Sequence, residues 1–188
     1  MHMSRGQIQA TNITPEEFER QVKVWLQAHS RGLKKFHVTN LKKVPGHGGE
    51  FEIDAVAQFE VLGGAIITVL VECKYYNSNH PVERDLVIIL GAKIRDTGAH
   101  KGIIFTTSKF QRGALTYAKA HGIATVRVEN GRTHYETKSY GPVEIPPWVP
   151  TYDYIGWMVT LTDDGNEHHS LITDDRGDPL QEWMGISR

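Results

Sequence analysis

The residues that most restrict the fold of this 188-residue chain form an apolar run that ends in charged side chains. Ala65–Cys73 is almost continuously apolar and rich in β-branched residues, a pattern typical of a strand buried on both faces. The run leads into Glu72 and Lys74, which lie two positions apart, so on a strand both side chains point to the same face. Because burying charge is costly unless the charge is paired or binds a metal, we expect this pair to serve a site.

A second strand is predicted just before this run. Residues 50–59 alternate between apolar and polar side chains, and Gly63-Gly64 is a hairpin signal. If the two strands pair across this hairpin, Asp54 converges with Glu72. The apolar face expected for the second strand carries Phe51, Ile53, Ala55 and Ala57.

The first helix has a clear start signal. Thr14 is the expected N-cap, Pro15 fits the first helical position, and Glu17 completes a capping box. Apolar residues then recur at helical spacing to about His29. The further expected elements are a strand over residues 35–38, a flexible loop over 44–49, a helix over 81–94, a strand over 101–107, a helix over 111–121 and a strand over 123–128. The last three form a strand–helix–strand unit, which favours parallel pairing of its strands.

The character of the chain changes after residue 128, where prolines and aromatic residues become frequent. Residues 152–162 and 168–173 are expected to pair as a hairpin around residues 163–166. The expected fold class is therefore α/β, with a helix, a three-stranded antiparallel meander and then helix, strand, helix and strand at residues 14–130. A small, acidic, β-rich appendage with many prolines and aromatic residues is expected at residues 131–188.

Asp54, Glu72 and Lys74 form the combination with the most chemical content. Two carboxylates and a free backbone carbonyl suit a hard cation with oxygen ligands, notably Mg²⁺. A lysine adds a positive charge and, with a lowered pKa, serves as a base. Such a group can activate a water molecule and stabilise a charged phosphoryl transition state. A surface salt bridge is the alternative for Glu72 and Lys74 alone, and the added Asp54 favours the functional interpretation.

With Asp54 followed by a hairpin into Glu72-Cys73-Lys74, the chain resembles the PD-(D/E)xK nuclease superfamily and, more closely, Mrr-like restriction endonuclease domains. The order of the expected elements is also that of the superfamily's restriction-endonuclease-like core. Further matching features are Phe18-Glu19 in the first helix, the glycine-rich residues 46–49 before Ile53-Asp54, the strand end Thr106-Thr107-Ser108 before Phe110, and the alanine-rich helix around residues 114–118. The resemblance covers roughly residues 14–130. Mrr-like domains often carry Gln where this chain has Glu72. In the superfamily as a whole, Glu is the commoner residue at this position.

The resemblance implies a role for each residue of the site. Asp54 and Glu72 would bind Mg²⁺, or Mn²⁺ in its place, with help from the backbone carbonyl of Cys73. Lys74 would orient or activate the attacking water and stabilise the developing charge. Glu19 would reach the site from the first helix, directly or through a metal-bound water. An exposed charge favoured by the helix dipole is an equal alternative for Glu19.

Candidate contacts to DNA come from two other segments. Thr107 and Ser108 precede a helix, so their hydroxyls and the free N–H groups could hold a phosphate, although ordinary helix capping is the stronger alternative. The lysines that flank the loop before Asp54 are candidates for phosphate contacts or merely solvated charges. These lysines are Lys34, Lys35, Lys42 and Lys43.

The formal net charge of −1 is an average over two opposite parts of the chain. Residues 1–128 hold 17 Lys and Arg against 11 Asp and Glu, which gives +6, whereas residues 129–188 give −7. A neutral total would offer no sign of a nucleic-acid partner, but a basic core is compatible with DNA.

We therefore expect a Mg²⁺-dependent DNA endonuclease that hydrolyses phosphodiester bonds in restriction or defence. A junction-resolving or repair nuclease of the same fold is the first alternative, and a non-catalytic DNA-binding or interaction module is the second. Because duplex cutting usually needs two active sites, a homodimer is expected. A single cysteine and the lack of an apolar stretch of ~20 residues favour a cytoplasmic protein without a membrane segment.

Overall fold

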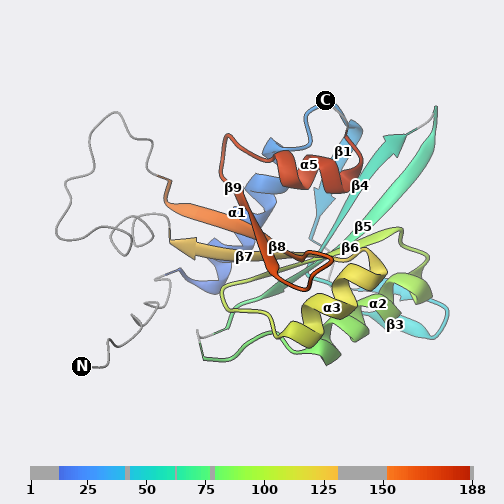
Figure 1. Ribbon diagram of the computed structural model, residues 1–188. Coiled ribbons are helices and arrows are strands. Elements are labelled where there is room, and N and C mark those ends of the chain that lie inside the picture. Colours follow the sequence, from blue (N-terminus) through green and yellow to red (C-terminus); the bar gives the residue numbers. More distant parts are fainter. Residues whose placement is uncertain (1–12, 41–42, 62, 77–78, 131–151, 187–188) are drawn as a thin grey trace, which may run out of the picture.

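A mixed seven-stranded sheet with helices on both faces organises the chain, as the computed structural model shows (Figure 1). The structure describes residues 13–40, 43–61, 63–76, 79–130 and 152–186. In spatial order the strands are β1 (Lys34–Thr39), β4 (Ala55–Val61), β5 (Ala65–Lys74), β6 (Lys101–Thr106), β7 (Ala124–Asn130), β8 (Tyr154–Leu161) and β9 (Glu167–Ile172). No helix in the described part of the chain is long and apolar enough to cross a membrane.

The pairing directions match the predicted α/β core. β1, β4 and β5 form the antiparallel meander, and β5, β6 and β7 pair in parallel. α2 (Arg84–Thr97) connects β5 to β6, and α3 (Arg112–His121) connects β6 to β7. The prediction of a restriction-endonuclease-like order of elements is therefore confirmed, although α2 begins three residues later than expected.

Two apolar layers hold the helices against the sheet. α1 (Pro15–Ala28) and α5 (Asp178–Met184) pack on one face, where their buried side chains join those of the strands in one core cluster. α2 and α3 cover the other face and share a second cluster with the opposite side chains of the same strands. The alternation of side chains along each strand thus supplies both layers, and in β5 it places Val71 in the first layer and Leu70 in the second.

The start of α1 follows the predicted capping box. The Thr14 hydroxyl accepts a hydrogen bond from the Glu17 amide, and the Glu17 carboxylate accepts one from the Thr14 amide. The buried face carries Phe18, Val22, Trp25 and Leu26. This face fixes the rotation of the helix, so Glu19, one position beyond Phe18, lies beside the buried stripe rather than within it.

The predicted strand over residues 50–59 is wrong at its start. The chain forms a small hairpin of β2 (Val44–Gly46) and β3 (Gly49–Phe51) where a loop was expected, then bends at Asp54 before β4. Because of this bend, Ile53 packs into the α2–α3 layer whereas Ala55 packs into the α1 layer, so the two do not share the predicted face. The carboxylate of Asp96 on α2 accepts a hydrogen bond from the Gly48 amide at 3.0 Å and holds the hairpin in place.

β5 is a buried central strand only in its second half. Its Val69–Val71 segment is fully enclosed, whereas Ile66 is 46% exposed near the β4–β5 turn. The first residues of β5 extend beyond the helices, so their apolar side chains remain at the surface. The charged end of the strand, by contrast, lies directly after its most buried segment.

The predicted C-terminal hairpin is present, and it continues the main sheet. β8 pairs antiparallel with β7, and β9 pairs with β8. Leu180 and Met184 of α5 enter the same core cluster as α1. Residues 152–186 therefore join the core at residues 14–130 through strand pairing with β7 and through the packing of α5.

Candidate functional site

Asp54 and β5 meet where the pairing of β4 and β5 ends. The last paired residues are Ala55 and Val71, so the backbone of β5 beyond this point has no partner on β4. Asp54 fills that place with its side chain, since its Oδ2 accepts a hydrogen bond from the Cys73 amide at 2.6 Å. The N–H and C=O groups of one strand residue point to the same neighbour, so the Cys73 carbonyl faces the same side.

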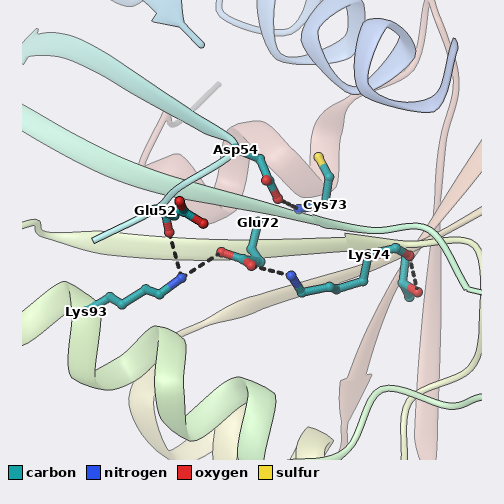
Figure 2. Close-up of polar contacts among 7 residues, drawn as sticks. Glu52, Asp54, Glu72, Cys73, Lys74 and Lys93 are labelled. Atoms are coloured by element: carbon teal, nitrogen blue, oxygen red, sulfur yellow. Dashed lines mark hydrogen bonds and ion pairs between the residues drawn. The ribbon is translucent and has the colours of Figure 1, made fainter. Parts of the chain in front are cut away.

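Glu72 is bound by two lysines on the face opposite Cys73 (Figure 2). Its Oε1 lies 2.5 Å from Nζ of Lys74, and its Oε2 lies 3.4 Å from Nζ of Lys93 on α2. The side chains of Glu72, Lys74 and Lys93 are 12%, 24% and 15% exposed. The structure therefore brings together Glu72 and Lys74 as predicted, and it adds a second cation.

Lys93 is the residue that the sequence prediction missed. Its Nζ also donates to the backbone carbonyl of Glu52 at 2.7 Å, which links α2 to the segment just before Asp54. The signal was present in the helix, because Lys93 follows the buried Leu90 by three positions and so lies near the buried side of α2. A lysine at such a position requires a partner.

Burial and like charge act together on the carboxylate of Asp54. Desolvation raises its pKa, and the negative charge of Glu72 raises it further, against the lowering effects of the Cys73 amide and of Lys74 and Lys93. The two lysines contact Glu72 rather than Asp54, so the charge of Asp54 is the less well compensated of the two carboxylates. This is the situation that a bound cation relieves.

Lys74 does not have the lowered pKa that a general base requires. Burial lowers its pKa, but the hydrogen bond and the charge of Glu72, with the charge of Asp54, outweigh burial and raise the pKa overall. Lys74 is therefore a fixed positive charge in this arrangement. The prediction that it acts through a lowered pKa is not supported, whereas its role as a positive charge is compatible with the geometry.

Glu19 lines the same pocket as Asp54 and Cys73. Desolvation raises the pKa of Glu19, and the charges of Asp54 and Glu16 add to this effect. Both carboxylates line this pocket, and the charge of Asp54 is therefore felt at Glu19. Glu19 is exposed, as the alternative of a solvated helix charge expects, and it also lines this pocket, so its role in the site stays a prediction.

The groups around Asp54 fit a hard divalent cation in chemical type. They offer carboxylate oxygens from Asp54 and Glu72 and the backbone carbonyl of Cys73. Within the described residues, no three Asp, Glu, His or Cys side chains converge on one point, and the oxygens of Glu72 are taken by the two lysines. A cation bound here would therefore require Glu72 to exchange a lysine for the metal.

Thr106, the last residue of β6, and Thr107, which follows it, support the end of β5. Thr106 donates its hydroxyl to the Lys74 carbonyl at 2.9 Å, and the Thr107 hydroxyl bonds both backbone groups of Tyr76. Ser108 is only 2% exposed. The Ser108 hydroxyl is therefore enclosed, and the Thr107 hydroxyl fixes the backbone at Tyr76. The DNA contacts of Thr107 and Ser108 stay predictions.

The described lysines that were predicted to contact phosphates lie at two places in the structure, along β1 and just before β2. Lys34 pairs across the β1–β4 ladder with Glu60, about 17 Å along the strand from Ala55. Lys35 forms an ion pair with Glu60 at 2.6 Å, and Lys43 forms one with Glu50 at 3.1 Å. Lys34 and Lys35 therefore lie far from Asp54. Lys42 is outside the described residues.

Comparisons with known proteins relate this arrangement to one family. The Mrr_cat family model, described as a restriction endonuclease, matches residues 10–130. Among curated proteins, none matches the chain.

Three solved structures are similar to parts of the chain. They are AF1548, a protein of unknown function (28% identity, TM-score 0.42), the DNA modification-dependent restriction endonuclease AspBHI (19%, 0.40), and the MspJI restriction endonuclease in complex with a 27-mer oligonucleotide (12%, 0.37). The similar parts cover 54%, 65% and 66% of this chain and 56%, 35% and 32% of the three structures, respectively. The chain thus spans about half the length of the first and about a third of the other two.

Proposed function

The chain belongs to the Mrr_cat restriction endonuclease family, and from this premise we propose that it is a Mg²⁺-dependent DNA endonuclease that hydrolyses phosphodiester bonds. The observation that carries the proposal is the placement of Asp54 against the end of β5, beside Glu72 and Lys74. Burying charge is costly unless the charge is paired or binds a metal, and the two lysines bind Glu72 whereas Asp54 is bound by a backbone amide. We further propose that the reaction serves restriction or defence.

Each residue of the site has a chemical task in this proposal. Asp54 and Glu72, with the Cys73 carbonyl, would hold Mg²⁺, and Mn²⁺ would be accepted in its place. When bound, the cation supplies positive charge to a phosphate oxygen and lowers the pKa of a water molecule. Lys74, whose own pKa is raised through its contact with Glu72, holds its proton and orients the attacking water or stabilises the charge that develops on the phosphate.

Glu19 contributes to the site from α1. Its position in the pocket with Asp54 and Cys73 suits a carboxylate that accepts a hydrogen bond from a metal-bound water. Its raised pKa means that it holds its own proton more readily than an ordinary glutamate when no cation is bound. A nearby cation would favour the ionised form, so we assign Glu19 to the site as a carboxylate that acts when the site is loaded.

The proposed partner is DNA, and the proposed assembly is a homodimer. The net charge of +6 over residues 1–128 favours a polyanion at the core. Cutting both strands of a duplex with one site per chain requires two chains. The cytoplasm is the proposed location, since the single cysteine fits a reducing compartment.

Incubation of supercoiled plasmid with the purified chain tests this function. We expect nicked or linear plasmid with Mg²⁺ or Mn²⁺ and intact plasmid with EDTA. The Asp54→Asn variant should leave the plasmid intact under all of these conditions. Cleavage that persists in EDTA would exclude a metal-dependent reaction, and binding to DNA without cleavage in any divalent cation would support a non-catalytic module instead.

A further inference from the structure

Lys93 occupies a place that a divalent cation would also seek. Its ammonium lies 3.4 Å from Oε2 of Glu72, and Lys74 binds the other oxygen of the same carboxylate. Lys93 is held there by the backbone carbonyl of Glu52 at 2.7 Å (Figure 2). All three charged side chains are at most about a quarter exposed, so bulk solvent screens their interaction only in part.

The charges at this point of the molecule balance without a metal. Among the charged groups that contact the end of β5, Asp54 and Glu72 contribute two negative charges, and Lys74 and Lys93 contribute two positive charges; Glu19 on α1 is not counted among them. A divalent cation bound to the two carboxylates would leave an excess of positive charge unless a lysine moved away or a phosphate arrived. The lysine that can yield is Lys93, because its ammonium has a second acceptor in the Glu52 carbonyl and its contact with Glu72 is the longer of the two.

We propose that Lys93 is a built-in counter-cation that occupies Glu72 in the metal-free protein and competes with the divalent cation for it. This inference rests on the proposed function, because it assigns the cation to Asp54 and Glu72. Lys93 is a positioning residue in this account, since it acts on the reaction through Glu72. It keeps the metal-free site neutral and ordered, at the expense of affinity for the cation.

A simple bracing role for Lys93 predicts something different. If the ammonium only ties α2 to Glu52, its removal should loosen the segment before Asp54 and weaken cation binding. If it competes with the cation, its removal should strengthen cation binding. A single charge within ~4–6 Å changes the protonation equilibrium of a carboxyl group by tenfold or more, and we expect an effect of about this size on the binding of a divalent cation.

The affinity for Mn²⁺ alone, measured without DNA from the paramagnetic resonance signal of the free ion, tests the competition. The variants are Lys93→Met and Lys93→Gln. The glutamine keeps a hydrogen-bond donor for the Glu52 carbonyl, so it can be measured even if Lys93→Met does not fold. Arg95→Met is the matched control, because it removes a positive charge from an exposed position of the same helix. Asp54→Asn identifies the site. Thermal unfolding of each variant confirms that it is folded.

We expect both Lys93 variants to bind Mn²⁺ about tenfold more tightly than the wild type, with Arg95→Met close to the wild type and binding lost in Asp54→Asn. Unchanged or weaker binding by a folded Lys93 variant would overturn the competition while leaving the metal site intact. Absence of Mn²⁺ binding from the wild type and from every variant would overturn both this inference and the proposed metal dependence. Binding that survives in Asp54→Asn would place the cation elsewhere and overturn both as well.

Discussion

Asp54 carries an unfavourable charge in the metal-free protein. It is partly buried, and its best partner is a backbone amide, whereas the nearby lysines bind Glu72. Desolvation and the charge of Glu72 raise its pKa, so the folded protein holds the proton of Asp54 more tightly than the unfolded chain does. Ionised Asp54 therefore lowers the free energy of unfolding, a cost typical of sites arranged for function.

This cost gives a stability prediction for Asp54→Asn. The usual pKa of the group is 3.8, so its destabilising effect should begin as the pH rises above that value and should be fully present above the raised pKa of the folded state. At neutral pH without divalent cations, we expect the variant to gain up to about 1 kcal/mol in free energy of unfolding. Urea denaturation at pH 7 and near pH 3 measures it.

The control for this prediction is the addition of Mg²⁺. The cation should stabilise the wild type, because it binds the folded state alone, and it should leave Asp54→Asn unchanged. A variant less stable than the wild type at pH 7 in EDTA would show that the charge of Asp54 is well compensated without a metal.

The site residues differ in how readily the sequence reveals them. Glu72 and Lys74 are two apart on a recognisable strand, and a hairpin signal joins that strand to Asp54, so local spacing suffices. Lys93 lies 21 positions from Glu72 and meets it only because α2 packs over β5. That contact depends on how the helix is rotated and placed over the sheet. The apolar pattern of a helix predicts which face is buried, but it does not predict which side chain of the sheet a given helix residue contacts.

α1 is tied to the C-terminal elements by polar as well as apolar contacts. The indole of Trp25 donates to Asp174 at 2.9 Å, and a ring nitrogen of His29 lies 2.7 Å from the Thr173 carbonyl. Gly177 passes so close to the His29 ring that a Cβ atom would lie only 2.0 Å from it. The helix that carries Glu19 is therefore held in place in part by the segment that follows β9.

Removal of residues 152–188 should therefore unfold more than the removed elements. The edge of β7 would lose its partner β8, and Trp25, which is fully buried, would lose its cover and its acceptor. We expect the truncated chain to show no cooperative thermal transition by circular dichroism, since lost burial of this extent exceeds the ordinary stability of a domain. A cooperative transition near the wild-type temperature would establish residues 14–130 as an independent domain.

The expected strands and helices were predicted well where the pattern is long and periodic. The order of the core elements and the C-terminal hairpin are confirmed. The prediction failed at residues 50–54, where alternation continued in the sequence but the chain bends. The bend is held by two residues of α2: Asp96 accepts a hydrogen bond from Gly48 in the hairpin, and Lys93 donates one to the Glu52 carbonyl. Contacts between segments far apart in sequence are not visible in a local pattern.

The described residues are built around one seven-stranded sheet, and the charge of the chain is unevenly distributed along its sequence. The basic residues 1–128 and the acidic residues 129–188 were expected to correspond to separate parts, yet β7 and β8 join them edge to edge. The pairing of strands follows backbone hydrogen bonds and apolar burial, so net charge did not reveal it. The acidic residues within 152–186 therefore belong to the same sheet and core as the proposed DNA-binding part (Figure 1).

The rate at which Lys74→Ala nicks supercoiled plasmid in Mg²⁺ tests the central claim most directly. Lys119→Ala is the matched control, because its ammonium pairs with Asp163 on the β8–β9 turn rather than with the site. We predict a loss of at least about 100-fold for Lys74→Ala, as for the removal of one group that stabilises transition-state charge, and an unchanged rate for Lys119→Ala. Equal nicking by Lys74→Ala and the wild type would contradict the assignment of this site as the nuclease centre.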